Sequence, residues 1–321
     1  MDNLTRRVND SLALINEYLT TTRGRVPVDA QLIDYAIDGV STFALGGKHL
    51  RAALVHISAG ELPAEREIIA TTFGACVDLL HGAFLIHDDI IDRDDTRRGH
   101  PTVHAAVREE YGDAHLGTSI GIAAGDIALN GALQILVDSP LDDALVRQAM
   151  RILTDAVQQT ILGEVLDVAH TVGQAPDPEL VRLSNDLKTS DYTFGAPLKL
   201  GALAAERDPA SMGPIARELG RAFQAADDIA GSVGNSEATG KLAGGDVLHG
   251  RATLMTMRMN GNSVESDPLA LGGIVREVVE EGQAHLRLAR THIAEAALSD
   301  SIRTGLQAVA DDVERMLRTY A

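Results

Sequence analysis

A run of about thirty residues, 63–92, carries apolar side chains at helical spacing and restricts the possible folds more than any other part of the chain. Its centre, residues 79–86, is apolar apart from His81 and Gly82, as expected of a buried segment. A helix of this length would be about 45 Å long, because each residue adds 1.5 Å. We therefore expect a long central helix that is buried over most of its length.

The same three- and four-residue rhythm returns through most of the sequence, and no alternating pattern long enough for a β-sheet occurs. Clusters of Gly, Pro, Asp and Asn separate the helical stretches. The pattern predicts an all-α fold, a single domain over residues 1–321 with roughly a dozen helices. The predicted helices cover residues 6–19, 28–44, 51–59, 63–92, 103–110, 117–137, 141–171, 178–205, 213–231, 251–259, 272–297 and 300–320.

Charge and composition limit the partners of such a chain. The formal net charge of -18 argues against a nucleic-acid partner and against an anionic membrane surface. A single cysteine, Cys76, excludes an intramolecular disulfide and indicates a reducing compartment. The best candidate membrane span, residues 116–137, is interrupted by Asp126 and Asn130, and the first ten residues contain no apolar signal region. We expect a cytoplasmic protein without a membrane span.

Three carboxylates and two arginines follow the long apolar run. Asp88 and Asp92 are four residues apart and would share one helix face, with Asp89 beside them. Carboxylates this close repel unless a cation lies between them, and oxygen ligands suit Mg²⁺. Arg97 and Arg98 add guanidinium groups, which match the geometry of phosphate. The cluster predicts a site for a metal and a multivalent anion.

A second carboxylate pair, Asp227 and Asp228, again ends an apolar helical stretch. With the first cluster it makes the whole chain resemble the isoprenyl (polyprenyl) diphosphate synthases, the trans-prenyltransferase family. The resemblance rests on motifs in the family's order from residue 46 to residue 253: Gly46-Gly47-Lys48-His49-Leu50-Arg51, the first Asp cluster with Arg97-Arg98-Gly99, Lys188-Thr189, Phe223-Gln224 with Asp227-Asp228, Gly240-Lys241 and Gly250-Arg251-Ala252-Thr253.

The resemblance implies an isoprenoid synthase fold, with helices around a central cavity, and a homodimer. It also implies condensation of isopentenyl diphosphate with an allylic diphosphate. In that reaction pyrophosphate leaves the allylic substrate, and the alkene of isopentenyl diphosphate attacks the carbocation. The departing pyrophosphate then takes up the released proton. The implied cofactor is Mg²⁺, with up to three ions per site.

The family's functional residues transfer to matching positions here. The metal ligands would be Asp88, Asp92 and Asp227, supported by Asp89 and Asp228. The allylic diphosphate would be bound by Arg97, Lys188, Lys241 and Arg251, and the metal-free isopentenyl diphosphate by Lys48, Arg51, His81 and Arg98. The residues assigned to catalysis are Lys188, Thr189, Gln224 and Lys241, of which Thr189 and Gln224 direct oxygens toward the cation.

Several positions depart from the family pattern. Gly231 stands where many relatives carry a third Asp, so metal binding by the second carboxylate pair depends more on Asp227. His49 replaces a usual Arg, and Glu164 replaces a frequent Gln ahead of Asp167. The remaining departures are Ala52 for Pro, Asn235 for an acidic residue and Arg251 for Lys. These changes bear on isopentenyl diphosphate affinity and metal stoichiometry and leave the first carboxylate cluster intact.

Product length would depend on side chains just before the first carboxylate cluster. Phe84 precedes Asp88 by one helical turn, Ala83 lies beside it and Leu80 one turn deeper. We expect these three residues to form the floor that stops the growing prenyl tail. In this family a small residue at the position of Ala83 goes with longer products, whereas the adjacent Phe84 is bulky. We predict a C20 product, with C15 as the alternative.

Two other functions share part of this pattern. A class I terpene cyclase would have the same metal clamp and fold, but it needs aromatic faces to stabilise carbocations. This chain has no Trp and only 3% aromatic residues. A non-catalytic regulatory subunit of a heteromeric synthase would carry eroded motifs, and Gly231 and His49 are departures of that kind. The intact first cluster favours the catalytic alternative.

Overall fold

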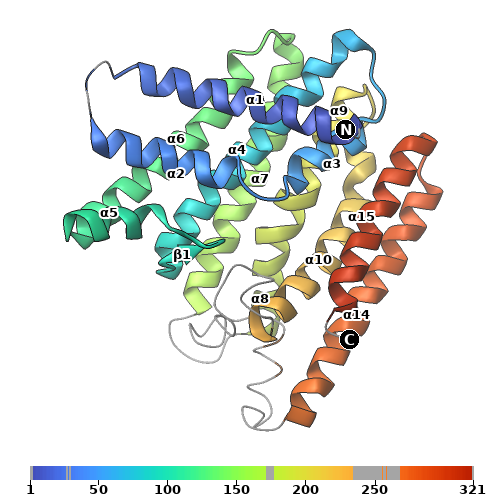
Figure 1. Ribbon diagram of the computed structural model, residues 1–321. Coiled ribbons are helices and arrows are strands. Elements are labelled where there is room, and N and C mark those ends of the chain that lie inside the picture. The colour runs from blue at the N-terminus through green and yellow to red at the C-terminus, as the bar shows by residue number, and fades with distance from the viewer. Residues whose placement is uncertain are drawn as a thin grey trace. The chain divides into compact units, whose positions relative to one another are not determined.

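The computed structural model describes residues 3–26, 28, 30–170, 177–233, 255, 258 and 268–319. Helices make up nearly all of this part of the chain (Figure 1), which confirms the predicted all-α fold. The strands found in the described ranges are β1, Thr96–Arg97, and β2, His100–Pro101, which form a two-stranded antiparallel hairpin. The chain divides into two compact units, residues 1–151 and 152–321, each described by itself.

The first unit is built around one central helix. Residues 67–92 form α4, and the short 3-10 helix η1, Ala64–Arg66, precedes it, so the long predicted helix is confirmed. Within this unit α4 packs against α1, α2, α3 and α6, and its buried side chains include Phe73, Leu79 and Leu80. The other helices of this unit include α1 Asn3–Gly24, α2 Gln31–Ala44, α3 Leu50–Ala59, α5 Val103–Tyr111 and α6 Ala114–Val137.

Helix α6 packs closely on α4 because its inward face carries almost no side-chain bulk. The buried residues of α6 are nearly all Gly or Ala. At Gly125 an added Cβ would lie 2.1 Å from His87 Nε2, so this position accepts only glycine without movement of the ring. Larger apolar residues of α6, such as Ile122 and Val137, are exposed. The helix starts at Ala114, earlier than predicted, because the Asp113 side chain accepts hydrogen bonds from two backbone N–H groups of its first turn.

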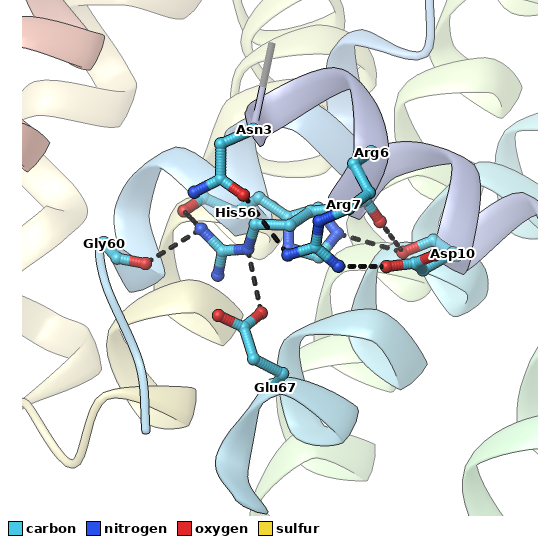
Figure 2. A network of polar contacts seen from close by, with 8 residues as sticks. Asn3, Arg6, Arg7, Asp10, His56, Gly60 and Glu67 are labelled. Atoms are coloured by element: carbon cyan, nitrogen blue, oxygen red, sulfur yellow. Dashed lines mark hydrogen bonds and ion pairs between the residues drawn. The ribbon is translucent and has the colours of Figure 1, made fainter. Parts of the chain in front are cut away.

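Buried polar side chains fasten α1 to α3 and α4 (Figure 2). Arg7 donates from Nη1 to the carbonyl oxygens of His56 and Gly60, at 3.2 and 2.9 Å, and from Nε to Glu67 Oε2 at 2.9 Å. Ser11 Oγ lies 3.0 Å from His56 Nε2. The His56 side chain is completely buried, and burial together with the charge of Arg7 lowers its pKa to about 3.

His56 is expected to make the fold sensitive to acid. In the unfolded chain its ring takes up a proton near pH 6.5, whereas in the folded protein it does so only near pH 3. The unfolded state therefore binds the extra proton between these values, and the free energy of unfolding should fall by about 1.4 kcal/mol per pH unit as the pH drops below 6.5. Urea unfolding at pH 7.5 and pH 5 measures this slope. His56→Asn should flatten it, exposed His115→Asn should not, and an unchanged slope in the His56 variant would contradict the assignment.

The second unit contains most of α7, Asp143–His170, from residue 152 onward, followed by α8, Pro178–Asn185, and α10, Gly213–Val233. The last two helices, α14 Pro268–Glu295 and α15 Asp300–Arg318, run side by side (Figure 1, orange and red). The 3-10 helix η3, Pro209–Met212, precedes α10. The helix predicted over residues 251–259 lies outside the described residues apart from Met255 and Arg258, which are helical.

The helix predicted over residues 178–205 is interrupted in the middle. Between α8 and α9, Ala196–Ala204, the chain forms a π-helix, η2, over Asp186–Gly195. Pro197 in the first turn of α9 has no N–H to donate, so the regular hydrogen-bond ladder cannot continue through it. π-Helical turns occur frequently at functional sites, and this one contains the predicted site residues Lys188 and Thr189.

Two helices of the described chain are long and apolar enough to cross a bilayer by length and composition alone, 64–92 and 114–137. The apolar window of the first is 72% buried within the protein, as in the core helix of a water-soluble protein. That of the second is 39% buried, because its large apolar side chains lie outside the packed face.

Candidate functional site

The first carboxylate cluster lies at the C-terminal end of α4, where the chain turns back through a hairpin. Arg93 adopts the left-handed conformation that ends the helix, with φ 59°. Strands β1 and β2 pair Arg97 with His100, and the two-residue loop between them, Arg98–Gly99, has positive φ at both residues. This is the conformation that tight β-hairpins prefer. The hairpin directs the buried Arg97 side chain toward the carboxylates and leaves Arg98 exposed.

Arg97 is held by the carboxylates of α4. Its Nε donates to Asp89 Oδ1, and its Nη2 lies 3.3 Å from Asp88 Oδ2 and 3.7 Å from Asp94 Oδ2. Asp89 is 1% exposed, and burial raises its pKa to about 6 despite the adjacent guanidinium. Its second oxygen, Oδ2, is buried and has no hydrogen-bond partner among the described residues. A buried carboxylate oxygen that no described donor reaches fits a site that takes a cation.

The carboxylates of this motif differ in exposure. Asp89 is buried, whereas Asp88 and Asp92 are partly exposed on the face of α4 that also carries His81 and Phe84. No group of three His, Cys, Asp or Glu side chains within the described ranges is already arranged as a metal site. Asp88 and Asp92 supply the oxygen donors that Mg²⁺ prefers, with Asp89 behind them, so the donor set fits this ion.

Cationic side chains gather beside this cluster, also within the first unit. Arg98 Nη1 donates to the Gly46 carbonyl at 2.8 Å. An added Cβ on Gly47, which has φ +110°, would lie 2.5 Å from the same nitrogen. Burial, then the charges of Arg51 and Arg98, hold the pKa of His81 well below its usual range. His81 is therefore a neutral hydrogen-bonding group among arginines, and Lys48 is exposed in the adjacent loop.

His49 fixes the start of α3 near these cations. Its backbone is left-handed, with φ 50°, and its Nδ1 lies 2.8 Å from Asp78 Oδ2. The other oxygen of Asp78 accepts from the backbone N–H of Ala52 at 3.1 Å. The buried Asp78 was not among the predicted site residues. Its signal in the sequence was a carboxylate inside an apolar helix, three residues before His81.

The second carboxylate pair, like the first cluster, has one buried and one accessible carboxylate. On α10, Asp227 is exposed and Asp228 is buried. Gln224, one turn earlier, donates from Nε2 to Asp228 Oδ1 and so fixes the buried carboxylate. The Phe223 ring meets that of Phe194 in η2 edge to face, at a centroid distance of 5.6 Å. This contact joins the second Asp motif to the π-helix that carries Lys188.

Comparisons with known proteins agree with this geometry. The sequence matches the family described as polyprenyl synthetase over residues 35–283. The chain belongs to the polyprenyl synthetase family. It is 31% identical over 278 residues to geranylgeranyl diphosphate synthase of Mycobacterium tuberculosis, a match that covers 83% of this chain and 76% of that protein. It is 28% identical over 291 residues to the enzyme of the same name from Methanosarcina mazei, covering 89% and 83%.

A solved structure extends the similarity to the whole fold. The geranylgeranyl pyrophosphate synthase of Corynebacterium glutamicum, complexed with isoprenyl diphosphate and magnesium, superposes with a TM-score of 0.86 at 26% identity and covers 98% of this chain and all of that one. The expected isoprenoid synthase fold and the expected prenyltransferase class are confirmed for this polyprenyl synthetase family member. The terpene cyclase alternative is correspondingly weakened.

Part of the predicted site of this family member lies outside the described residues. Lys241, Arg251 and the side chain of Thr189 belong to that part. Of the floor residues, Ala83 and Leu80 are buried inside the first unit, whereas Phe84 is partly exposed on the face that carries Asp88. In the first unit the structure brings together two groups of predicted site residues. One is Asp88, Asp89 and Arg97, and the other is Arg51, His81 and Arg98. In the second unit it brings together Gln224 and Asp228.

Proposed function

We propose that this protein condenses isopentenyl diphosphate with allylic diphosphates in a Mg²⁺-dependent reaction and releases an all-trans C20 prenyl diphosphate, with C15 as the alternative product. The observation that carries the proposal is the pair of neighbouring clusters at the end of α4. One holds Asp88 and Asp89, and the other holds Arg51, His81 and Arg98. A reaction between two diphosphates, one bound with metal and one without, needs both kinds of cluster.

In this proposal Asp88, Asp92 and Asp227 hold Mg²⁺, and the buried Asp89 and Asp228 keep the neighbouring side chains in place. When bound, Mg²⁺ neutralises the charge that develops on the leaving pyrophosphate, an effect worth several kcal/mol. The relative from Corynebacterium glutamicum, which was crystallised with isoprenyl diphosphate and magnesium, supports the use of Mg²⁺. We propose up to three ions per site, as the family resemblance implies.

The cationic cluster would bind the second diphosphate. Arg51, Arg98 and Lys48 supply charge, and Arg98 is positioned by the Gly46 carbonyl. The low pKa of His81 keeps its ring neutral, so it would donate a hydrogen bond to a phosphate oxygen without adding charge. The allylic diphosphate would be bound by Arg97, Lys188, Lys241 and Arg251. Lys188, Thr189, Gln224 and Lys241 would act in catalysis, with oxygens of Thr189 and Gln224 directed toward the carbocation.

One assay tests the proposal. Purified protein is incubated with Mg²⁺, labelled isopentenyl diphosphate and, in turn, the C5, C10 and C15 allylic diphosphates, and the dephosphorylated products are sized. Linear C20 alcohols are expected. Cyclic hydrocarbons alone would support a class I terpene cyclase instead, and the absence of product with every primer would support a regulatory subunit.

Phe84 should set the product length. It precedes Asp88 by four residues and lies about 6 Å farther down the axis of α4, on the same partly exposed face. Phe84→Ala removes the ring from the path of the tail, and we expect the main product to lengthen by at least one C5 unit. Chromatography of the dephosphorylated products measures this. Tyr111→Ala, which removes an exposed aromatic side chain from α5, is the control, and an unchanged product distribution in the Phe84 variant would exclude Phe84 as the floor.

We also propose that the protein is a cytoplasmic homodimer, in line with the family resemblance. The exposed large apolar residues of α6, among them Ile122 and Val137, would bury themselves against a second copy of the chain. The single cysteine, Cys76, is buried, and burial raises the pKa of its thiol to about 12. An unreactive thiol and the lack of any possible internal disulfide suit a reducing compartment.

A further inference from the structure

A buried carboxylate of α4, Asp78, holds the start of α3 from outside that helix. The Asp78 side chain is 4% exposed, and its two oxygens bind different groups. Oδ2 accepts from His49 Nδ1 at 2.8 Å, and Oδ1 accepts from the backbone N–H of Ala52 at 3.1 Å. Burying a carboxylate is costly unless hydrogen bonds satisfy it, and the proposed function gives this one no role.

Asp78 acts as the cap that α3 lacks. The residue at the N-cap position of α3 is His49, whose side chain accepts no hydrogen bond from the first turn. An N-cap side chain usually accepts from the second or third N–H group of its helix. Ala52 is the third residue of α3, so Asp78 supplies this acceptor from the neighbouring helix. Its carboxylate also lies at the positive end of the α3 dipole, where a negative charge is stabilising.

The backbone at His49 is held by the same carboxylate. It has φ 50° and ψ 38°, the left-handed conformation that residues other than Gly, Asn and Asp rarely adopt. The bond from His49 Nδ1 to Asp78 ties this conformation to α4. Lys48 precedes His49 directly and Arg51 follows two residues later, so the same bond fixes the backbone between these two cations.

The two helices meet here at the proposed metal-free diphosphate site. Asp78 and His81 are three residues apart and share one face of α4. Arg51 directly precedes Ala52, whose N–H group is bound to Asp78. Burial, and then the charge of Arg51, hold the pKa of His81 well below its usual range, so these two side chains are neighbours.

We propose that Asp78 is a positioning residue that sets Arg51 beside His81 for a diphosphate bound without metal. The proposal rests on the proposed function and deepens it. A guanidinium binds phosphate through two parallel hydrogen bonds and therefore needs a fixed direction, which a fixed first turn of α3 provides. A purely electrostatic role would have the opposite sign, because a carboxylate near the site repels an anion.

Inorganic pyrophosphate is the probe, and titration calorimetry on the full chain in chelator gives its affinity without metal. Asp78→Asn keeps the volume of the side chain but leaves one acceptor oxygen in place of two. It should weaken pyrophosphate binding about tenfold, the contribution of one hydrogen bond to a charged group. Glu218→Gln is the matched control and should keep the wild-type affinity. Glu218 is a buried carboxylate that accepts from His285 Nδ1 at 2.7 Å in the second unit.

Variants of His49 and Arg51 separate positioning from a general loss of structure. His49→Asn keeps an N–H donor at the place of Nδ1 and tolerates the left-handed backbone, so it should bind like the wild type. His49→Ala removes the donor and should weaken binding. Arg51→Lys places a flexible point charge that gains little from a fixed direction. Adding Asp78→Asn to Arg51→Lys should therefore change the affinity by less than about twofold.

Several results would overturn the proposal. Unchanged binding by Asp78→Asn would remove its role, and tighter binding would show that only its charge matters. Equal losses in Asp78→Asn and Glu218→Gln would reflect stability alone. Equal losses in His49→Asn and His49→Ala would mean that the imidazole contacts the anion itself. A tenfold effect of Asp78→Asn that persists in Arg51→Lys would mean that Asp78 does not act through Arg51.

The condensation assay keeps this proposal distinguishable from the proposed function. In Asp78→Asn the KM for isopentenyl diphosphate should rise about tenfold, whereas kcat and the KM for the allylic diphosphate should stay within about twofold. If the wild type forms prenyl products but binds pyrophosphate in chelator no better than Asp78→Asn, only the role of Asp78 fails. If the wild type forms none, the proposed function fails, and the calorimetric comparison still decides the role of Asp78.

Discussion

Asp88→Ala is expected to lower kcat about a thousandfold while leaving the fold intact. The Asp88 carboxylate is the part of the first cluster that is both partly exposed and in line with Asp92 on α4. Losing a metal ligand should remove several kcal/mol of charge stabilisation from the transition state, and each 1.36 kcal/mol corresponds to a factor of ten in rate. Steady-state turnover with a C15 primer measures the loss directly.

The expected cost of Asp88→Ala in stability is small. The variant loses the 3.3 Å ion pair to Arg97, which is partly exposed on the Asp88 side, and Arg97 keeps its contact with the buried Asp89. The melting temperature should therefore stay close to that of the wild type, which separates loss of catalysis from loss of fold. Asp155→Ala, an exposed carboxylate on α7, is the matched control and should keep wild-type turnover. Near-normal turnover of Asp88→Ala would mean that the metal ligands of the first carboxylate cluster are assigned to the wrong residues.

The helices could be predicted from the sequence because their burial pattern is periodic. The long run at 63–92 became α4, and its apolar faces meet four neighbouring helices, as a helix that is apolar on nearly every side requires. The π-helix η2 could not be predicted. Its local sequence is compatible with an α-helix up to Pro197, and the close approach of Gly163 to the backbone nitrogen of Lys188 is a long-range contact.

The residue types of the site, and so its chemistry, could be predicted from the sequence. Which side chains form hydrogen bonds and ion pairs with one another could not. Three carboxylates and two arginines near one helix end indicate a metal and phosphate site from spacing alone. Which arginine faces the carboxylates depends on the β1–β2 hairpin, which buries Arg97 and turns Arg98 toward Gly46. The partners of Lys188 and His49 lie 21 and 29 residues away in sequence, and no local pattern specifies them.

The buried member of each Asp motif should behave differently from its accessible neighbour. In α4 the buried carboxylate is Asp89, and in α10 it is Asp228, which is fixed by Gln224. Removing a buried carboxylate that accepts a hydrogen bond takes that hydrogen bond away, at a cost of about 1–3 kcal/mol. Asp228→Ala is therefore expected to lower the free energy of unfolding by this amount, whereas the exposed Asp227→Ala should leave it nearly unchanged.

The loss of turnover should be larger for Asp227→Ala than for Asp228→Ala, which is the reverse of the order expected for stability. Because Gly231 stands in place of a third carboxylate, Asp227 is the one accessible acid of this motif in the described part of α10, and no neighbour in the motif can replace it. Asp227→Ala is expected to lower kcat about a thousandfold, as Asp88→Ala does, and Asp228→Ala by a much smaller factor. Urea unfolding and steady-state kinetics on the two variants test both orders at once. If Asp228→Ala lost more turnover than Asp227→Ala at equal stability, the buried carboxylate would be the metal ligand and exposure would not identify the ligands of this family member.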